Sequence, residues 1–153
     1  MGIAVDDSSQ TIYVATEFLQ NLKTVLLDKT LVDLNDILAK VRLMKSTAEA
    51  VQLIHQKGFA HKSIKLENFL VKEMDGNRQL LLSDFGIASF TANSNMCLNA
   101  STFAVSAPEV FNLKTTNYLP CDIYSLGMVF WSIIHREIPF ESRISVKERA
   151  TAS

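Results

Sequence analysis

Four short stretches of the chain contain side chains that can do chemistry. They are His61–Asn68, Asp84–Gly86, Ala107–Glu109 and Asp122–Gly127. Their carboxylate, amide, lysine and imidazole groups are the types that hold metal ions, contact phosphates and move protons. Each stretch alone is weak evidence, because a tripeptide such as Asp-Phe-Gly occurs by chance in many proteins. The functional prediction therefore depends on all four together, in this order and at this spacing.

The first stretch follows the clearest helix that the sequence predicts. Apolar residues recur at steps of three and four from Leu34 to Ile54, and Asp33 or Asn35 is the expected N-cap. Gly58 is expected to end this helix as its C′ residue, in the left-handed conformation. The loop that begins at His61 therefore starts just beyond the end of the helix.

A hairpin is expected to hold the second stretch. The apolar runs Phe69–Val71 and Leu80–Leu82 flank Asp75-Gly76-Asn77, which is a favourable turn sequence. Asp84 then leaves the end of the second strand. At the beginning of the chain, Ile3–Val5 and Thr11–Ala15 predict two further strands joined by a turn.

Helices and loops are expected in the rest of the chain. Leu22–Leu27 favours a short helix, residues 87–106 a loop, and Pro108 the first residue of another short helix. Asp122 is expected to cap a buried helix that ends near His135 and is too short to span a bilayer. The same carboxylate is expected to bond the backbone of the 61–68 loop. These elements predict an α+β protein that is mostly helical.

Composition excludes several classes of protein. With 153 residues, 48% hydrophobic residues and a net charge of −1, the chain predicts one domain without disorder or a nucleic-acid-binding face. Its five glycines never stand at a G-x-G spacing, so it contains neither a Walker loop nor a G-x-G-x-x-G phosphate loop. The two cysteines, Cys97 and Cys121, lack metal-ligand spacing, and the N-terminal residues lack the features of a signal peptide. We therefore predict a cytoplasmic protein with no membrane segment.

The four stretches together resemble the protein-kinase catalytic domain, whose signatures are H-R-D-L-x-x-x-N, D-F-G and A-P-E. The resemblance runs from about Ile3 to Glu141, and Lys65 places it in the serine/threonine or tyrosine-kinase-like branch. It implies a protein-kinase-like fold with a mostly helical C-terminal lobe and remnant strands of the N-terminal lobe. Residues 1–19 would be the N-lobe remnant and hinge, and 20–153 the C-lobe without its last helices.

The resemblance also implies ATP and Mg²⁺ as cofactors, if nucleotide binding survives. Asp84 and Asn68 would supply oxygen ligands to Mg²⁺, and Lys65 would contact the γ-phosphate. Thr16 would be the gatekeeper of the adenine site. Glu17 and Leu19 would form the hinge beside the adenine.

Leu70 would form the apolar floor under the adenine.

The sequence departs from the family where catalysis needs a base. Ser63 stands at the position of the catalytic aspartate, and a serine hydroxyl is not anionic near neutral pH. The Gly-rich loop, the lysine of V-A-I-K and the αC glutamate precede the point in the family domain at which this chain begins.

Three functions stay open at this point. The first is a pseudokinase or truncated kinase that acts as a binding or regulatory module in signalling, with a protein partner. The second is an active serine/threonine kinase with a protein substrate and an atypical catalytic loop. The third is a truncated gene product without function. The resemblance implies no nucleic acid as partner.

Overall fold

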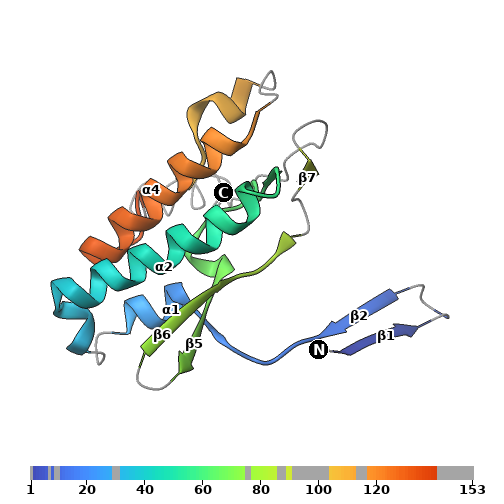
Figure 1. Cartoon of the computed structure of the whole chain (residues 1–153), viewed down its shortest axis with the longest axis horizontal. Helices are drawn as coiled ribbons and strands as arrows, with labels where there is room; N and C mark the ends of the chain where they lie inside the picture. Colours follow the sequence, from blue (N-terminus) through green and yellow to red (C-terminus); the bar gives the residue numbers. More distant parts are fainter. Residues whose placement is uncertain are drawn as a thin grey trace, which may run out of the picture.

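Two long helices pack side by side in the structure (Figure 1). They are α2 (Ile37–His55) and α4 (Leu119–His135). The computed structural model describes residues 2–6, 8, 11–28, 32–74, 77–85, 89–90, 104–112 and 117–140. Among these residues, no helix is both long enough and apolar enough to cross a membrane.

The N-terminal end of α2 lies later in the sequence than predicted. Asp36 is the N-cap, and its Oδ1 accepts a hydrogen bond of 3.2 Å from the Leu38 N–H. The predicted caps, Asp33 and Asn35, belong instead to a short 3₁₀ helix, η1 (Val32–Asn35). That prediction was wrong because the periodic apolar pattern does not distinguish a preceding 3₁₀ turn from the first turn of the helix.

The C-terminal end of α2 depends on a glycine, as predicted. The cap is Gln56, and Gly58 adopts a φ of +78° while its N–H donates to the His55 carbonyl at 2.9 Å. This left-handed conformation favours glycine. Gly58 lies one residue later than the predicted C′ position, and the short strand β4 (Phe59–Ala60) follows directly.

A three-stranded sheet packs against α2. Its order is β3 (Gln20–Asn21), β5 (Phe69–Met74) and β6 (Asn77–Leu82), with both pairs antiparallel. The predicted hairpin is therefore confirmed, and its strands are longer than the apolar runs alone. Residues 75 and 76 of the predicted turn lie outside the described residues.

The first hairpin is also confirmed. Strands β1 (Gly2–Asp6) and β2 (Thr11–Ala15) pair antiparallel, and they extend away from the helices in Figure 1. Helix α1 (Leu22–Leu27) follows β3, and the Asn21 side chain caps it by accepting the Thr24 N–H at 2.9 Å. The predicted strand pair and short helix therefore both form where expected.

Helix α4 begins before the residue that was predicted to cap it. Tyr118 is the N-cap, Pro120 lies in the first turn, and Asp122 is already inside the helix. The prediction that Asp122 caps the helix was wrong, because proline is tolerated in a first turn, where its missing N–H needs no partner. The predicted end at His135 is confirmed.

Part of the predicted loop at 87–106 is ordered secondary structure. Strand β7 (Ser89–Phe90) pairs with β4, so the prediction of a loop was wrong there. Residues 87–88 and 91–103 lie outside the described residues. The predicted short helix at Pro108 is present as the 3₁₀ helix η4 (Pro108–Asn112).

The main core lies among α1, α2, α4 and the three-stranded sheet. Its fully buried side chains come from all of these elements, and include Leu22, Leu26, Val51, Phe69, Val129 and Ile133. The alternation along β5 turns Phe69 and Val71 into this core and leaves Leu70 on the opposite face, half-buried.

Arg136 joins the end of α4 to the end of α1. Its Nε donates to the Leu26 carbonyl at 3.1 Å, and its two Nη atoms donate to the Asp28 carbonyl at 2.6 Å and to Asn35 Oδ1 at 3.1 Å. Two of these acceptors are carbonyls at the end of a helix, which need partners from outside it. The guanidinium therefore both caps α1 and holds it against α4.

We expect Arg136→Ala to lower the free energy of unfolding by about 1–3 kcal/mol, because three charge-assisted hydrogen bonds are lost at a partly exposed site. Urea denaturation followed by circular dichroism measures the change. Lys57→Ala, at an exposed position beyond α2, is the control and should leave the midpoint unchanged. Equal midpoints for Arg136→Ala and the control would contradict the role of the guanidinium.

Candidate functional site

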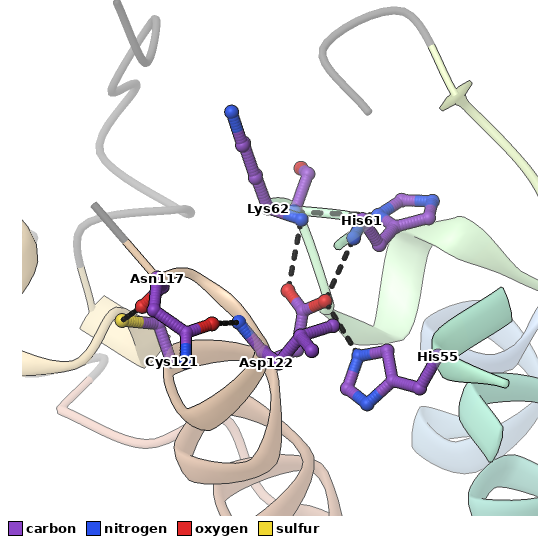
Figure 2. A network of polar contacts seen from close by, with 8 residues as sticks. His55, His61, Lys62, Asn117, Cys121 and Asp122 are labelled. Atoms are coloured by element: carbon purple, nitrogen blue, oxygen red, sulfur yellow. Dashed lines mark hydrogen bonds and ion pairs between the residues drawn. The ribbon is translucent and has the colours of Figure 1, made fainter. Parts of the chain in front are cut away.

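Asp122 holds the 61–68 loop in place from inside α4 (Figure 2). Its Oδ2 accepts the His61 N–H at 2.7 Å, and its Oδ1 accepts the Lys62 N–H at 2.8 Å. The carboxylate is 1% exposed, and His55 Nε2 lies 2.9 Å from the same Oδ2. The prediction that Asp122 bonds this backbone is confirmed. The contact with His55 was not predicted.

The bonds from Asp122 hold a backbone conformation that is unfavourable for lysine. Lys62 has a φ of 66°, in the left-handed region that side chains with a Cβ rarely adopt. Its Nζ lies 4.3 Å from the centre of the Tyr118 ring, at the start of α4. Burial lowers the pKa of Lys62, and the charge of Asp122 opposes that shift in part. The loop is therefore fixed to α4 through both its backbone and a side chain.

The uncharged imidazole of His61 links the loop to the end of β6 by hydrogen bonds. Its Nδ1 accepts the Ser63 N–H at 3.3 Å, so its Nε2 carries the proton and donates to the Ser83 carbonyl at 2.9 Å. Its ring meets Phe85 edge-on at 5.0 Å between ring centres. Phe85 is 49% exposed, so this ring contact lies at the edge of the buried loop and not in the core.

The environment of His61 predicts a loss of stability in acid. Burial lowers the pKa of His61, while the bond to Ser83 and the charges of Asp122 and Asp84 oppose the shift. The unfolded chain therefore takes up this proton near pH 6.5, before the folded protein does. Below that pH, we expect His61 to reduce the free energy of unfolding by up to about 1.4 kcal/mol per pH unit.

Urea denaturation at several values between pH 7.5 and pH 5 measures the slope of stability against pH. The slope of His61→Gln should be smaller than that of the wild type, because glutamine does not titrate. His135→Gln, at an exposed ring at the end of α4, is the control for the loss of a histidine. If His61→Gln keeps the wild-type slope, another group is responsible for the acid sensitivity.

Ser63 and Asn68 are bonded to each other inside the loop. Asn68 Nδ2 donates to the Ser63 carbonyl at 2.7 Å and to Ser63 Oγ at 3.1 Å, and both residues are buried. Because both N–H groups of the amide are used, the Asn68 Oδ1 is the atom left to accept a donor or a cation. Ser63 therefore presents a buried neutral hydroxyl, bonded to the Asn68 amide, at this point of the loop.

The hairpin places Asp84 beside Asn68. Phe69 pairs with Leu82 across the β5–β6 register, so Asn68 stands opposite Ser83. The Ser83 N–H and Oγ both donate to the Asn68 carbonyl, at 2.8 and 3.0 Å. Asp84 follows at once, exposed and with a φ of 62°. The backbone of Asp84 is thus held next to that of Asn68.

Lys65 and its neighbours connect the loop to α1. Lys65 is buried, and its carbonyl accepts the Asn68 N–H at 3.0 Å in the 3₁₀ turn η2 (Leu66–Asn68). Glu67 in that turn forms an ion pair of 2.9 Å with Lys23 of α1. The loop is therefore held by a helix on each side.

The predicted hinge lies at the opposite edge of the sheet from Asp84. Thr16 and Glu17 are exposed, and Leu19 is half-buried. Glu17 forms an ion pair of 2.7 Å with Lys72 of β5, and in the next residues Asn21 pairs with Leu70. The structure therefore brings the hinge segment to β5, where Leu70 lies.

Comparison with known proteins identifies the family. The model of the family described as "Protein kinase domain" matches residues 3–152, nearly the whole chain. The chain belongs to the protein kinase domain family. Among curated relatives of this kinase chain, calcium/calmodulin-dependent protein kinase type I of Schizosaccharomyces pombe is 34% identical over 117 residues, 72% of this chain and 34% of the relative. The predicted family resemblance is confirmed.

Other relatives are also serine/threonine kinases. Serine/threonine-protein kinase ppk34 of Schizosaccharomyces pombe is 42% identical over 94 residues, which are 60% of this kinase chain and 26% of the relative. The chain thus spans about a third or less of the length of these relatives.

Solved kinase structures confirm the α+β protein-kinase-like fold. A chain of the yeast RNA Pol II CTD kinase CTDK-1 complex has a TM-score of 0.73 at 22% identity, covering 92% of this chain and 45% of that one. This match shows the fold alone. A chain of the Chaetomium thermophilum CAK complex bound to ATP-gamma-S has a TM-score of 0.66 at 28% identity, covering 92% of this chain and 43% of that one.

Proposed function

We propose that this kinase chain does not carry out ordinary phosphotransfer and serves as a binding or regulatory module in cytoplasmic signalling, with a protein as partner. One observation carries the proposal. The Ser63 Oγ is buried and accepts a hydrogen bond from the Asn68 amide, so this residue offers a hydroxyl and no carboxylate. We take Ser63 as the residue at the position of the family's catalytic aspartate. A neutral hydroxyl cannot accept the proton of a substrate alcohol without a base of its own.

We further propose that the site keeps the ability to bind Mg²⁺ with ATP. Mg²⁺ prefers oxygen ligands and uses one or two protein groups together with phosphate oxygens. The Asn68 Oδ1 and the Asp84 carboxylate are such a pair, and the Ser83 bonds hold their backbones together. Bound Mg²⁺ would neutralise phosphate charge. Lys65 is proposed as the phosphate contact, and Thr16, Glu17, Leu19 and Leu70 as the adenine contacts.

A thermal-shift titration tests this binding. At Mg·ATP about tenfold above Kd, we expect the wild-type Tm to rise by about 3–6 °C. The rise should disappear in Asp84→Ala, because the metal loses its only carboxylate of the proposed pair, and should persist in Glu137→Ala, an exposed control. Absence of a shift in the wild type, or an equal shift in Asp84→Ala, would contradict nucleotide binding at this site.

A further inference from the structure

The side chains of α4 are distributed in the opposite way to those of an ordinary surface helix. Its polar residues Asp122, Ser125 and Ser132 are buried. Figure 1 shows α4 along one edge of the molecule, with α2 beside it. A helix at such an edge normally turns charged and polar side chains to water, whereas a helix that is apolar all round is covered on all sides. The outer face of α4 is therefore expected to be covered by a further element.

Large apolar side chains form one stripe along this outer face. Ile123, Tyr124, Trp131 and Ile134 are 54%, 45%, 37% and 44% exposed. Together with Gly127, which is also exposed, they recur at steps of three and four and so share one face of the helix. We call these five residues the α4 stripe. None of them is charged, and large apolar side chains gathered on one exposed surface mark a site of interaction.

His135 holds the largest side chain of the α4 stripe in a fixed orientation. Its ring stacks on that of Trp131, with 4.3 Å between the ring centres and 23° between the planes. Its Nδ1 donates to the Trp131 carbonyl at 2.8 Å, one turn back in the helix. A ring that is already fixed loses little conformational entropy on binding, and tryptophan is enriched among the residues that dominate interface energies. Trp131 is therefore the expected anchor of an interface.

Gly127 stands at the centre of the α4 stripe, although glycine destabilises the interior of an exposed helix relative to alanine. A Cβ added at Gly127 would meet no neighbouring atom within 4 Å in the described part of the chain. The packing of the chain itself therefore does not require glycine there. Glycine does allow another backbone to approach closely from outside.

The α4 stripe is nearly symmetric about Gly127. Ile123 and Trp131 stand four residues before and four residues after it, about 6 Å away along the helix axis in each direction. In an antiparallel pair of α4 helices, related by a two-fold axis at Gly127, each Trp131 would meet Ile123 of the other copy. The two glycines would meet at the axis. The α4 stripe is therefore complementary to itself.

The exposed area of the α4 stripe is of the size that a dimer needs. Its four large side chains expose roughly 400 Å² in total, taking each as on the order of 200 Å² when fully exposed. A standard interface buries about 800 Å² per partner, and in homodimers about two-thirds of that area is apolar. We propose that the α4 stripe pairs with itself and joins two copies of this chain into an antiparallel, two-fold dimer. This inference goes beyond the function proposed above and does not depend on Ser63.

Sedimentation equilibrium of the chain between about 1 and 200 μM tests the proposal. We expect a monomer–dimer equilibrium with a Kd of about 10 μM. Ile123→Glu should weaken it by about tenfold or more, because it brings a charge into an apolar interface. Leu38→Glu is the matched control, because Leu38 is 59% exposed and lies on α2, and it should leave the Kd unchanged. Circular dichroism of both variants at about 1 μM verifies that they are folded.

Gly127→Ala separates pairing from folding, because it acts on the two in opposite directions. At about 1 μM, where the chain is monomeric, its Tm should rise by about 2–4 °C, since alanine favours the helix. The Kd of the dimer should rise by about tenfold, since two methyl groups would keep the helices apart where they cross. A role of Gly127 in the fold alone would not produce these opposite changes.

The proposal is wrong if the chain stays monomeric at about 200 μM, in which case the α4 stripe belongs to an interface with a different protein segment. It is also wrong if Ile123→Glu and Leu38→Glu associate alike, or if Gly127→Ala dimerises as tightly as the wild type. Phosphotransfer by the wild type would overturn the proposed regulatory function and leave these measurements as they are.

Discussion

Replacing Asp122 with alanine is expected to lower the free energy of unfolding by about 3–5 kcal/mol. The carboxylate is almost completely buried and accepts the N–H groups of His61 and Lys62, with His55 Nε2 also at 2.9 Å. Alanine would leave both backbone donors without a partner in a region that water does not reach. Leaving a buried donor unpaired costs more free energy than a hydrogen bond contributes net to stability.

The backbone of Lys62 adds to this effect. Its φ of 66° is costly for a residue with a Cβ, and the two bonds to Asp122 are what hold it there. Without them, we expect the 61–68 loop to relax and the contacts of His61 to weaken with it. Asp122→Asn should also be strongly destabilising, because its amide N–H₂ would face a backbone N–H that needs an acceptor.

Urea denaturation of three variants separates these contributions. Asp36→Ala removes an aspartate that accepts a backbone N–H at an exposed helix start, and should cost about 0.5–2 kcal/mol. His55→Ala removes one bond to Asp122 and leaves both backbone donors paired, so it should cost less than Asp122→Ala. If Asp122→Ala costs no more than Asp36→Ala, the buried carboxylate is not what stabilises the loop.

Local patterns predicted most of the elements correctly. The steps of three and four along α2 identify a helix, and the turn sequence after Phe69–Val71 identifies a hairpin, since both signals depend on neighbouring residues. The errors arose where a second structure fits the same signal. Val32–Asn35 forms a 3₁₀ turn before the helix, and Pro120 is accepted within the first turn of α4.

Contacts between distant residues were predictable only where a family motif specifies them. The bond from Asp122 to the 61–68 loop was expected, whereas the contact of His55 with Asp122 joins residues 67 positions apart and has no local signal. The same holds for the packing of α2 against β6, since these two elements meet only in the folded chain. Sequence motifs thus name residues of a site, but the packing decides which additional groups touch them.

The Ser63 position is where the largest change in activity is expected. With labelled ATP and an array of serine and threonine peptides, wild type and Ser63→Ala should both stay at background, since neither side chain is anionic. Ser63→Asp should raise phosphotransfer by about 10²–10⁴-fold over the wild type, the usual contribution of a general base. The Asn68 amide that now donates to Ser63 Oγ would donate to the new carboxylate and orient it.

The comparison of three variants makes the result decisive. Ser63→Asn, which has nearly the size of aspartate without its charge, controls for the added volume in a buried loop and should stay at background. A drop from measurable wild-type activity to background in Ser63→Ala would show that the serine itself takes part, which would favour an active kinase with an atypical loop. Unchanged background in Ser63→Asp would show that the missing carboxylate is not what limits transfer. If phosphotransfer activity rises only in Ser63→Asp, the inactivity of the wild type is due to this one side chain, because all variants share the same backbone and the same Asn68 contact.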